Sequence, residues 1–557
     1  MQSTAPRRRN LDGERFDVAV IGGGINGVAI ARECARAGRH TVLLEQRDFS
    51  SGTTSRSTRI IHGGLRYLEH GEIGLVRESL RERQRLLREH PHLVRPLTFV
   101  LALAPGARHS ALAIRAGLWF YSAFSRQRNG NIRDVFQLEH QLDQGRRWAL
   151  FVYQDAQCEF PERLVAEWLN EAVNFGAVLR NYATVLGLEA PHGRVRTLIF
   201  RDELSGQEQR LEARWIVNAS GPWADLVCQQ LGVRTAKPML GGVRGSHIVL
   251  PSFEGAPQTA IYSEAADRRP FFAVPWNGQL LVGTTEISDG SNPSAVQPSR
   301  EEIEYLLNSI RRLLPQQQFE AADIRYTFAG VRPLPYSPGR AEAAVTRRHL
   351  VIDHTEDGAA GMVSVIGGKL TTAASLARDC ARRIGISVME PAPALVAPAP
   401  ANGVEAAFEH WVQQISRGAH IPPSSARAIA EWHGSHAMRV AHLASQDERL
   451  RATLCPHTDH LVAEAIAAFQ TEHAATLADV LLRRVPVALG ACWSAECSTI
   501  AAQRIGRMLV WSEAAIARAL ESFEEERHAF LQPTVLEQVK TSGKASLSVT
   551  SPQGVTQ

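Results

Sequence analysis

Three observations predict an α/β protein with three domains. The first is a unit of strand, glycine turn, helix and strand within residues 16–45. The second is a series of short β-like runs separated by turn residues within 241–325. The third is a helical pattern over 405–535, which follows a Pro- and Ala-rich stretch at 388–404 that predicts a linker. A chain of 557 residues is also too long for one core, so several domains are expected.

The N-terminal unit has the order of elements that binds a dinucleotide. An apolar run over residues 16–21 leads into Gly22, Gly24 and Gly27, which have G-x-G-x-x-G spacing. The first glycine permits the tight turn, the second lets a pyrophosphate approach the backbone, and the third lets the helix pack on the strand. Glu45 follows about 20 residues later, where an acid accepts hydrogen bonds from a ribose. The unit therefore predicts a Rossmann-like domain.

Composition excludes several other classes. A formal net charge of +4 is close to balanced and does not suggest nucleic-acid binding, which needs a concentrated basic face. Seven scattered cysteines suggest reduced thiols in a cytoplasmic setting. No apolar run is long enough to predict a transmembrane helix. Residues 1–15 and 541–557 are predicted to be disordered tails.

Residues 96–128 allow two interpretations. The stretch is apolar and aromatic, it is interspersed with arginine, and it contains no acidic residue. This pattern suits a helix that lies in a membrane interface, but it also suits a core helix with a basic rim. The sequence leaves both interpretations open.

Several further motifs carry a family resemblance. Together with the glycine unit, the stretches GTTSRSTRIIHGGLRYLEH, NASGPW, GSHIVLP, AGVRPL, IGGKLTT and TLADVLLRR resemble the FAD-dependent glycerol-3-phosphate dehydrogenases. These enzymes belong to the glycine/D-amino-acid oxidase-like flavoprotein superfamily. The resemblance implies the following division: an FAD-binding domain of three parts (16–95, 151–240 and 326–387), a substrate- or membrane-facing segment (96–150), a β-rich substrate domain (241–325) and a helical C-terminal domain (405–535).

The resemblance also implies a reaction. sn-Glycerol 3-phosphate would be oxidised to dihydroxyacetone phosphate, with hydride passing from C2 to flavin N5 and electrons passing on to a quinone. Such an enzyme would be cytoplasmic and attached peripherally to the inner face of the cytoplasmic membrane. The alternatives are a glycerol-3-phosphate oxidase that uses oxygen, an amine or amino-acid oxidase of the same fold, and a non-catalytic flavoprotein.

The site residues come from the same motifs. His247 is the expected base, and Arg332 is expected to face the reacting C2 oxygen. The substrate phosphate calls for arginines, whose planar fork donates two parallel hydrogen bonds. The residues expected to bind substrate are Arg66, Tyr67, Arg347 and Lys369. Because Arg348 is adjacent to Arg347, the sequence leaves open which of these two arginines faces the substrate. The residues expected to contact FAD are Gly22, Gly24, Ile25, Asn26, Gly27, Glu45, Thr53, Thr54, Ser55, Ser57, His62, Gly63, Gly64, Val185, Gly221, Gly368, Leu370 and Thr371.

The C-terminal region contains a cluster of potential metal ligands in sequence. Cys455, His457 and His460 lie close together, with Cys492 and Cys497 further on. Their spacing matches no standard zinc pattern, so no metal site is predicted. The C-terminal helices are instead expected to cover the flavin domain or to mediate contacts of a homodimer.

Overall fold

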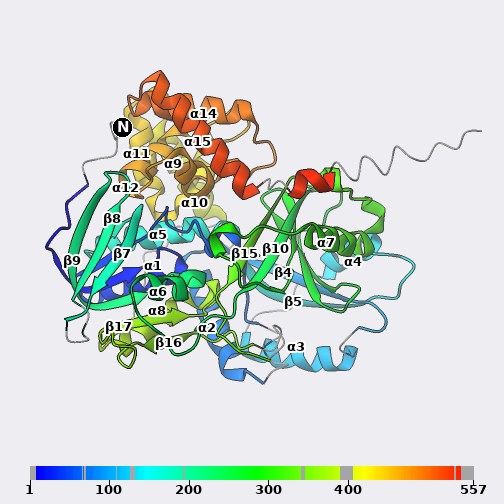
Figure 1. The fold of residues 1–557 in the computed structure, drawn as a ribbon. Helices are drawn as coiled ribbons and strands as arrows, with labels where there is room; N and C mark the ends of the chain where they lie inside the picture. The colour runs from blue at the N-terminus through cyan, green and yellow to red at the C-terminus, as the bar shows by residue number, and fades with distance from the viewer. Residues whose placement is uncertain are drawn as a thin grey trace, which may run out of the picture.

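The chain forms two β-sheets side by side, with a helical domain packed above them (Figure 1). The computed structural model describes residues 8–64, 67, 71–107, 110–125, 132–191, 194, 196–339, 345–388, 405–531 and 535–540. Each sheet has its own core, and the core of the helical domain is continuous with part of the second sheet. This arrangement confirms the predicted fold class.

The first sheet contains the predicted dinucleotide-binding unit. Strands β6, β2, β1, β9 and β17 are parallel, β16 pairs antiparallel with β17, and β7 and β8 extend β9 as an antiparallel meander. The strands of this sheet are β1 (Arg15–Ile21), β2 (Thr41–Leu44), β6 (Val178–Arg180), β7 (Ala183–Glu189), β8 (Thr197–Asp202), β9 (Gln207–Asn218), β16 (Leu350–Asp353) and β17 (Met362–Ile366).

Both faces of this sheet are covered, which explains the continuous apolar run of β1. Val18 and Val20 face helices α1 (Ile25–Arg36), α5 (Pro161–Asn174) and α8 (Ala373–Arg383). The alternate residues Ala19 and Ile21 face the β7–β8–β9 meander and α6 (Ala224–Gln230). Strands that are buried on both faces lack polar alternation, as the sequence of β1 does.

The second sheet is mainly antiparallel and covers more of the chain than expected. Its order is β14, β10, β13, β12, β11, β4, β5 and β3, with β15 paired to β10, and only β4 and β11 run parallel. The strands are β3 (Ile60–Ile61), β4 (Val94–Leu103), β5 (Ala149–Cys158), β10 (Val243–Pro251), β11 (Ala260–Glu264), β12 (Pro270–Trp276), β13 (Gln279–Gly283), β14 (Ile287–Ser288) and β15 (Tyr326–Arg332). Helix α7 (Arg300–Leu313) covers one face of it.

Three strands lie differently in the fold from what the sequence suggested, while the expected domain limits stay predictions. Strands β5 and β15 were expected in the nucleotide-binding domain, but both belong to the second sheet. Residues 96–103 were expected to be helical, but they form most of β4. An apolar run does not specify which sheet its strand joins, and a short apolar run does not distinguish a strand from a buried helix.

Within the described part of 104–128, residues 111–125 form helix α3 (Ala111–Ser125), which lies at the lower edge of the molecule in Figure 1. Leu112 is 76% exposed and Trp119 is 74% exposed, whereas Tyr121 is buried. One side of α3 is thus exposed and apolar at these positions, and the other side packs on the core. Contact with a membrane interface stays a prediction. No helix within the described residues is long and apolar enough to cross a membrane.

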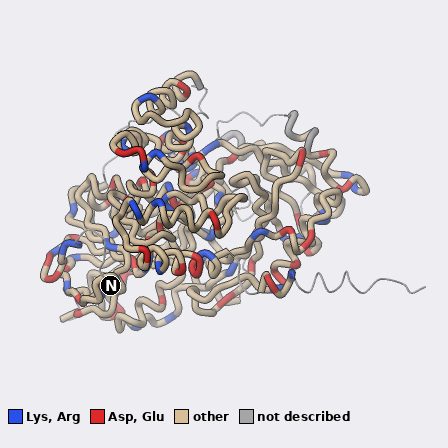
Figure 2. Tube along the Cα trace, turned by 90° about the horizontal axis from the view of Figure 1, so that it is seen from above, with Lys and Arg blue, Asp and Glu red and all other residues tan. Residues whose placement is uncertain are grey.

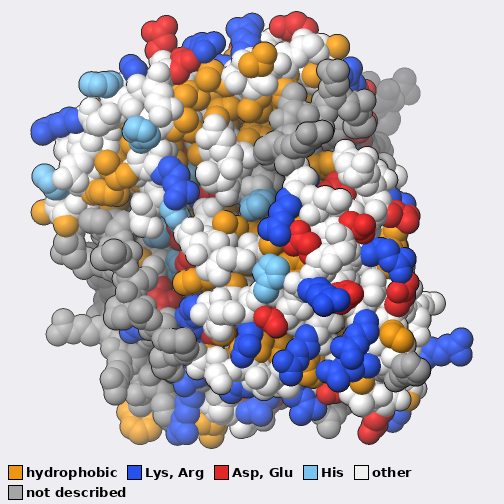
Figure 3. Space-filling model, turned by 90° about the vertical axis from the view of Figure 1, so that its left-hand side faces the viewer, with side chains coloured by type: hydrophobic (Ala, Val, Ile, Leu, Met, Phe, Trp, Pro, Cys, Tyr) orange, Lys and Arg blue, Asp and Glu red, His pale blue; other side chains and the backbone are white. Residues whose placement is uncertain are grey.

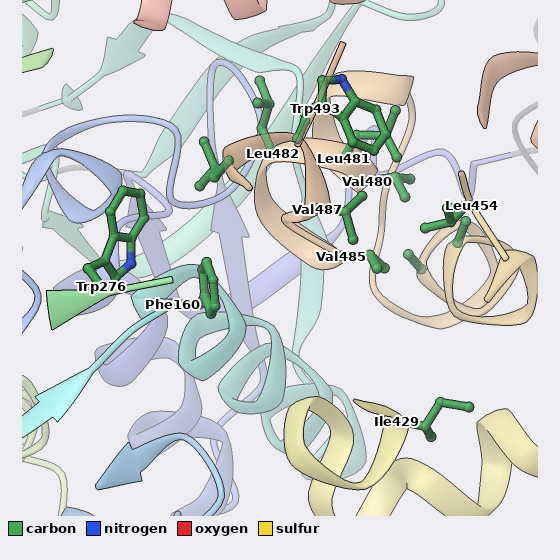
Figure 4. Close-up of a cluster of buried hydrophobic side chains, with 14 of the residues drawn as sticks. Phe160, Trp276, Ile429, Leu454, Val480, Leu481, Leu482, Val485, Val487 and Trp493 are labelled. Carbon is green, nitrogen blue, oxygen red and sulfur yellow. The ribbon is translucent and has the colours of Figure 1, made fainter. Parts of the chain in front are cut away.

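The C-terminal domain is helical, as predicted. Its longer helices are α9 (Glu405–Ala419), α10 (Pro423–His433), α11 (Ala437–Gln446), α12 (Val462–Thr471), α14 (Ala495–Met508) and α15 (Glu513–Leu531). A π-helical turn, η13 (Val480–Arg484), lies in the core of this domain. Figure 4 shows Val480, Leu481 and Leu482 of this turn in the same cluster as Phe160 and Trp276 of the other domains.

Residues 8–14 were expected in a disordered tail, and for them the prediction is wrong. Leu11 is fully buried, and its backbone N–H donates to Gln209 Oε1 at 2.9 Å. Arg8 donates to the carbonyl and to the side chain of Asn181, both at 2.6 Å. These partners lie more than 170 residues away, so local composition could not reveal them.

Charges are mixed over the molecular surface. Figure 2 shows basic and acidic residues interspersed along the described chain. On the face in Figure 3 basic side chains are more frequent in the lower half, with acidic side chains among them.

Candidate active site

A cleft of about 530 Å³ lies where the two sheets meet. One side is formed by the carboxyl ends of β1, β2 and β9 and by the segment after β17, and the other side is formed by residues of β10 and β15. Ligands of α/β proteins bind at the carboxyl ends of parallel strands, and the volume is in the range of small-molecule sites.

The glycine turn is shaped so that a ligand can approach its backbone closely. Gly22 has a φ of +103°, and a Cβ there would lie 2.7 Å from the carbonyl oxygen of Ala219. A Cβ on Gly27 would lie 1.8 Å from the carbonyl oxygen of Gly22, so this glycine serves packing and not ligand contact. Helix α1 begins after Gly24 without a capping side chain or an acid in its first turn. Its N-terminus is therefore suited to a phosphate group.

Glu45 lies at the end of β2 and lines the cleft. Its carboxylate accepts hydrogen bonds from the backbone N–H of Gly23 at 2.6 Å and of Arg47 at 2.9 Å. Burial raises the pKa of Glu45 in spite of these two bonds. A ribose hydroxyl would supply a further donor to this buried carboxylate.

Most of the residues expected to contact a cofactor line this cleft. They are Gly22, Gly24, Ile25, Asn26, Glu45, Thr53, Thr54, Ser57, His62, Val185, Gly221, Gly368, Leu370 and Thr371. The carbonyl of Val185, however, already accepts a hydrogen bond from Gln230 at 2.7 Å.

Ser55, Gly63 and Gly64 lie behind the lining. Ser55 donates its hydroxyl to the carbonyl of Ser50 at 2.7 Å, and the N–H of Gly63 donates to Tyr121 Oη at 3.0 Å. A Cβ on Gly64 would lie 1.9 Å from the Tyr67 ring. These residues shape the wall of the cleft without facing it.

The segment after β17 brings a second glycine turn to the cleft. Asn26 Nδ2 donates to the carbonyl of Gly367 at 3.3 Å, and a Cβ on Gly368 would lie 2.7 Å from the same nitrogen. The buried Asn26 Oδ1 has no hydrogen-bond partner within the described residues. An unsatisfied buried amide oxygen beside two glycine turns marks a place for a ligand with hydrogen-bond donors.

His247 is buried at the far end of the cleft, on β10 between β13 and β15. Its Nε2 lies 2.9 Å from Thr58 Oγ1, and its ring stacks on Phe328 with centroids 4.9 Å apart. A Cβ on Gly283 would lie 2.3 Å from the imidazole, so the glycine makes room for the ring. Burial, followed by the charges of Arg332 and Arg59, lowers the pKa of His247 to about 3. The imidazole is therefore neutral at neutral pH.

Three expected cationic residues line the same region, namely Arg332, Arg347 and Lys369. Arg332 Nη2 donates to Thr284 Oγ1 at 2.8 Å, and Arg347 Nη2 donates to Glu286 Oε1 at 3.2 Å. Arg348 is exposed, which resolves the register in favour of Arg347. The fourth expected cation, Arg66, lies outside the described residues.

Lys369 is half-buried, with a hydroxyl and an aromatic ring beside its ammonium group. Its Nζ donates to Ser79 Oγ at 2.9 Å and lies 4.2 Å from the centroid of the Tyr67 ring, which also lines the cleft. Burial is the largest effect on this amine and lowers the pKa of Lys369 to about 7, although Glu78 and Glu72 oppose the shift. A buried ammonium of this kind gains from an anionic ligand.

Sequence reasoning missed Thr58, Arg56 and Arg59, which all line the cleft. The guanidinium of Arg56 lies 4.7 Å above the Phe530 ring of α15, and burial lowers the pKa of Arg56 to about 10. Arg59 pairs with Glu162 at 2.9 Å, with both side chains 1% exposed. All three belong to GTTSRSTRIIHGG, and the two arginines three positions apart in that motif were the available signal.

The potential metal ligands of the helical domain divide into two groups. Cys455, His457 and Cys497 have their ligand atoms within 4.8 Å of one another. His460 lies apart from them, hydrogen-bonded to Glu464 at 2.9 Å and stacked on Trp432 with centroids 3.6 Å apart.

Comparison with known proteins places this geometry in context. The family model for FAD dependent oxidoreductase matches residues 17–382, and the model for the C-terminal domain of alpha-glycerophosphate oxidase matches residues 398–516. The chain is 37% identical to a glycerol-3-phosphate dehydrogenase of Synechocystis sp., over 85% of this chain and 89% of that protein. It is 35% identical to a D-erythritol 1-phosphate dehydrogenase of Brucella abortus, over 67% and 74% of the respective chains.

A solved structure shares the whole fold. The glycerol-3-phosphate dehydrogenase of Bacillus halodurans complexed with FAD superposes with a TM-score of 0.74, over 94% of this chain and 97% of that chain, at 22% identity. Both the dinucleotide-binding part and the helical domain are thus shared with this structure.

Proposed function

This chain belongs to the FAD dependent oxidoreductase family, and on that premise we propose that it oxidises sn-glycerol 3-phosphate to dihydroxyacetone phosphate. The observation that carries the proposal is the end of the cleft, where Arg332, Arg347 and Lys369 gather near the neutral, buried His247. A substrate with a phosphate and a secondary hydroxyl matches this set of groups. The related glycerol-3-phosphate dehydrogenases support the same substrate.

The cleft fits FAD. Two glycine turns leave space that a Cβ would fill, the α1 N-terminus is open to a pyrophosphate, and Glu45 and Asn26 offer buried acceptors. The bound flavin supplies the acceptor for the hydride that leaves C2 of the substrate.

Arg347 and Lys369 would bind the phosphate. An Arg donates two parallel hydrogen bonds to phosphate oxygens, and a Lys ammonium acts as a point charge. The dianion would raise the pKa of Lys369 from about 7 and so keep the amine protonated in the complex.

His247 would accept the proton of the C2 hydroxyl. Its imidazole is neutral in the free protein, and the phosphate dianion would raise its low pKa toward the working range. Arg332 would stabilise the negative charge that develops on the C2 oxygen. Thr58, 2.9 Å from Nε2, holds the ring in position.

Other reactions of this fold are less well supported. An amine substrate has no anionic group for Arg347 and Lys369 to bind, and an amino acid has only a singly charged carboxylate, whereas a phosphate dianion calls for two cations. The relative that acts on D-erythritol 1-phosphate favours a second candidate, a longer polyol phosphate, because its recognition would use the same phosphate-binding groups. Both candidates share the hydroxyl and phosphate chemistry.

The electrons are proposed to pass to a quinone, with the protein attached peripherally to the membrane. The exposed Leu112 and Trp119 of α3 support this attachment, because an apolar helix face with an aromatic residue suits the lipid interface. An oxidase that uses oxygen is the alternative acceptor reaction. A homodimer stays a prediction from the sequence.

The test is an anaerobic titration of the FAD-loaded protein. sn-Glycerol 3-phosphate should bleach the flavin absorbance, glycerol should not, and D-erythritol 1-phosphate should bleach it only if the pocket takes the longer chain. Arg347→Ala should weaken substrate binding, whereas Arg348→Ala is the matched control, since Arg348 is exposed beside it. A flavin that stays oxidised with both phosphates would overturn the proposal.

The electron acceptor is tested separately. The reduced protein should be reoxidised faster by a soluble quinone than by air-saturated buffer. Faster reoxidation by oxygen, with hydrogen peroxide formed, would favour the oxidase.

A further inference from the structure

The helical domain contains a compact group of two thiols and an imidazole outside the cleft. Cys455 and His457 belong to a turn over residues 453–461, and Cys497 belongs to the first turn of α14. The Sγ of Cys497 lies 3.5 Å from His457 Nδ1, and the three ligand atoms lie within 4.8 Å of one another. Cys455 and Cys497 are fully buried, while His457 is exposed.

The separation of Cys497 and His457 suits two ligands of one tetrahedral ion. Zinc binds sulfur at about 2.3 Å and imidazole nitrogen at about 2.0–2.1 Å, so two ligands on one zinc lie roughly 3.5–3.8 Å apart. The observed distance between Cys497 and His457 equals the sulfur–nitrogen edge of such a tetrahedron. Two thiolates and an imidazole also select zinc over hard cations such as magnesium.

A fourth ligand is at hand. Cys492 is the exposed cysteine of the chain, and its Sγ lies 3.7 Å from the carbonyl oxygen of His457. The carbonyl of Cys492 in turn lies 3.8 Å from Cys497 Sγ. Cys492 therefore borders the group, although its Sγ is not among the atoms that lie within 4.8 Å of one another. Turned toward the group, its thiol would complete a site of three cysteines and one histidine, one of the usual structural zinc sets.

The backbone around the ligands is fixed. Thr453 and Leu461 form a β-bridge across the turn, and the N–H of Leu454 donates to the carbonyl of His460 at 2.8 Å. Ser494 caps α14 and accepts from the N–H of Cys497 at 3.3 Å. A site held by hydrogen-bonded segments loses little conformational freedom when the metal binds.

We propose that Cys455, His457, Cys492 and Cys497 bind a structural zinc ion. The ion would join the 453–461 turn to the start of α14. It would also fix the segment between them in space: Leu489 accepts a hydrogen bond from Tyr326 Oη at 2.9 Å, and Ala491 accepts one from Arg325 at 2.6 Å. Zinc would thus secure the segment through which the helical domain contacts the second sheet.

The first measurement is the metal content of the untagged, FAD-loaded protein after growth in zinc-supplemented medium. Elemental analysis should find about one zinc per chain that survives dialysis against a weak chelator. A content below about a tenth of that, with all seven cysteines reactive as free thiols after denaturation, would overturn the proposal. Another metal in stoichiometric amount, or a disulfide among these cysteines, would overturn it as well.

Variants assign the ligands. The double variant Cys455→Ser/Cys497→Ser should lose the zinc, while Cys34→Ala/Cys380→Ala, which removes two buried thiols of the nucleotide-binding part, should keep it. Cys492→Ser should release zinc to the chelator faster than the unmodified protein, and an unchanged release rate would remove Cys492 from the site. A strong chelator should lower the melting temperature of the unmodified protein and not that of the double variant. The metal content of the unmodified protein decides the proposal even if a variant fails to fold.

Discussion

Replacing Arg484 by Met should destabilise the contact between the helical domain and the loop that follows Glu45. Arg484 binds Asp48 through two parallel hydrogen bonds, each 2.8 Å long. The side chains are 1% and 0% exposed. Arg483 binds the same carboxylate, and Asn181 donates to it at 3.2 Å. Asp48 therefore joins the dinucleotide-binding domain to the RR pair of the TLADVLLRR motif.

The size of the effect follows from this geometry. Burial alone would raise the pKa of Asp48, but the charges of Arg484 and Arg483 outweigh burial and hold it below its usual value. Removing one partner of a buried pair costs about 3–5 kcal/mol, because the other charge stays buried. Arg483 and Asn181 remain, so the lower end of that range, about 3 kcal/mol, is expected. In a cooperative unit of about 150–250 residues, a loss of about 3 kcal/mol lowers the melting temperature by roughly 6–12 °C.

The assay is thermal unfolding of the FAD-loaded protein, followed both by circular dichroism and by flavin release. Arg449→Met is the matched control, because Arg449 and Asp447 form an ion pair on the surface, and its melting temperature should not change measurably. The double variant Asp48→Asn/Arg484→Met should lose less stability than the sum of the losses in the two single variants. Equal melting temperatures for Arg484→Met and Arg449→Met would refute the reasoning.

The pH dependence gives a second check on Asp48. A carboxyl whose pKa is lowered in the folded protein contributes stability above its unfolded pKa of about 4 and loses it as the pH falls through the folded value. The difference in the free energy of unfolding between the unmodified protein and Arg484→Met should therefore be largest at pH 7 and should shrink below pH about 4. A difference that grows on acidification would contradict the assigned charge state.

Three further predictions concern the cleft and α3. Arg332→Ala should slow flavin reduction by about 10²–10³ with FAD still bound, measured by anaerobic stopped flow; an unchanged rate would exclude Arg332 from the reaction. The dissociation constant of glycerol 3-phosphate should rise by up to about tenfold per pH unit above pH 7, because Lys369, with a pKa of about 7, then loses its proton. Lys369→Arg should remove that rise, and a persistent rise would point to another group. The double variant Leu112→Ser/Trp119→Ser should reduce co-sedimentation with anionic vesicles at least about tenfold. Val510→Ser, at a side chain 87% exposed on the helical domain, is the control and should not reduce it. Equal vesicle binding by the two variants would refute the role of α3.

Local patterns predicted the nucleotide-binding unit correctly, and the reason is that its determinants are local. Gly27 is required by the carbonyl of Gly22 in the same turn, and Gly22 by the positive φ of that turn. By contrast, β5 and β15 were assigned to the wrong sheet, since pairing is decided by partners far along the chain. Leu11 was missed for the same reason, because its burial depends on residues about 200 positions away.

The site shows the same division. The motifs identified His247, Arg332 and Lys369, which the fold brings into one cleft. They could not distinguish Arg347 from Arg348, because adjacent residues of an irregular segment have no periodicity that assigns a face. The spacing of Cys455 and Cys497 gave no zinc pattern, because the turn and the helix that carry them meet only after folding.

The bond between Asp48 and Arg484 spans 436 positions of the chain. Ribosomes add about 5–20 residues per second, so Asp48 leaves the ribosome roughly 20–90 seconds before its partner is made. Strand β17, which completes the parallel sheet beside β9, also arrives only at residue 362. During synthesis the N-terminal half therefore has β9 without its partner β17, and Asp48 without its arginine partners, until the later segments are made. A protein truncated before residue 483 would lack the RR pair that neutralises Asp48, so the glycine-turn domain cannot reach its final ion-paired form until the C-terminal part has been made.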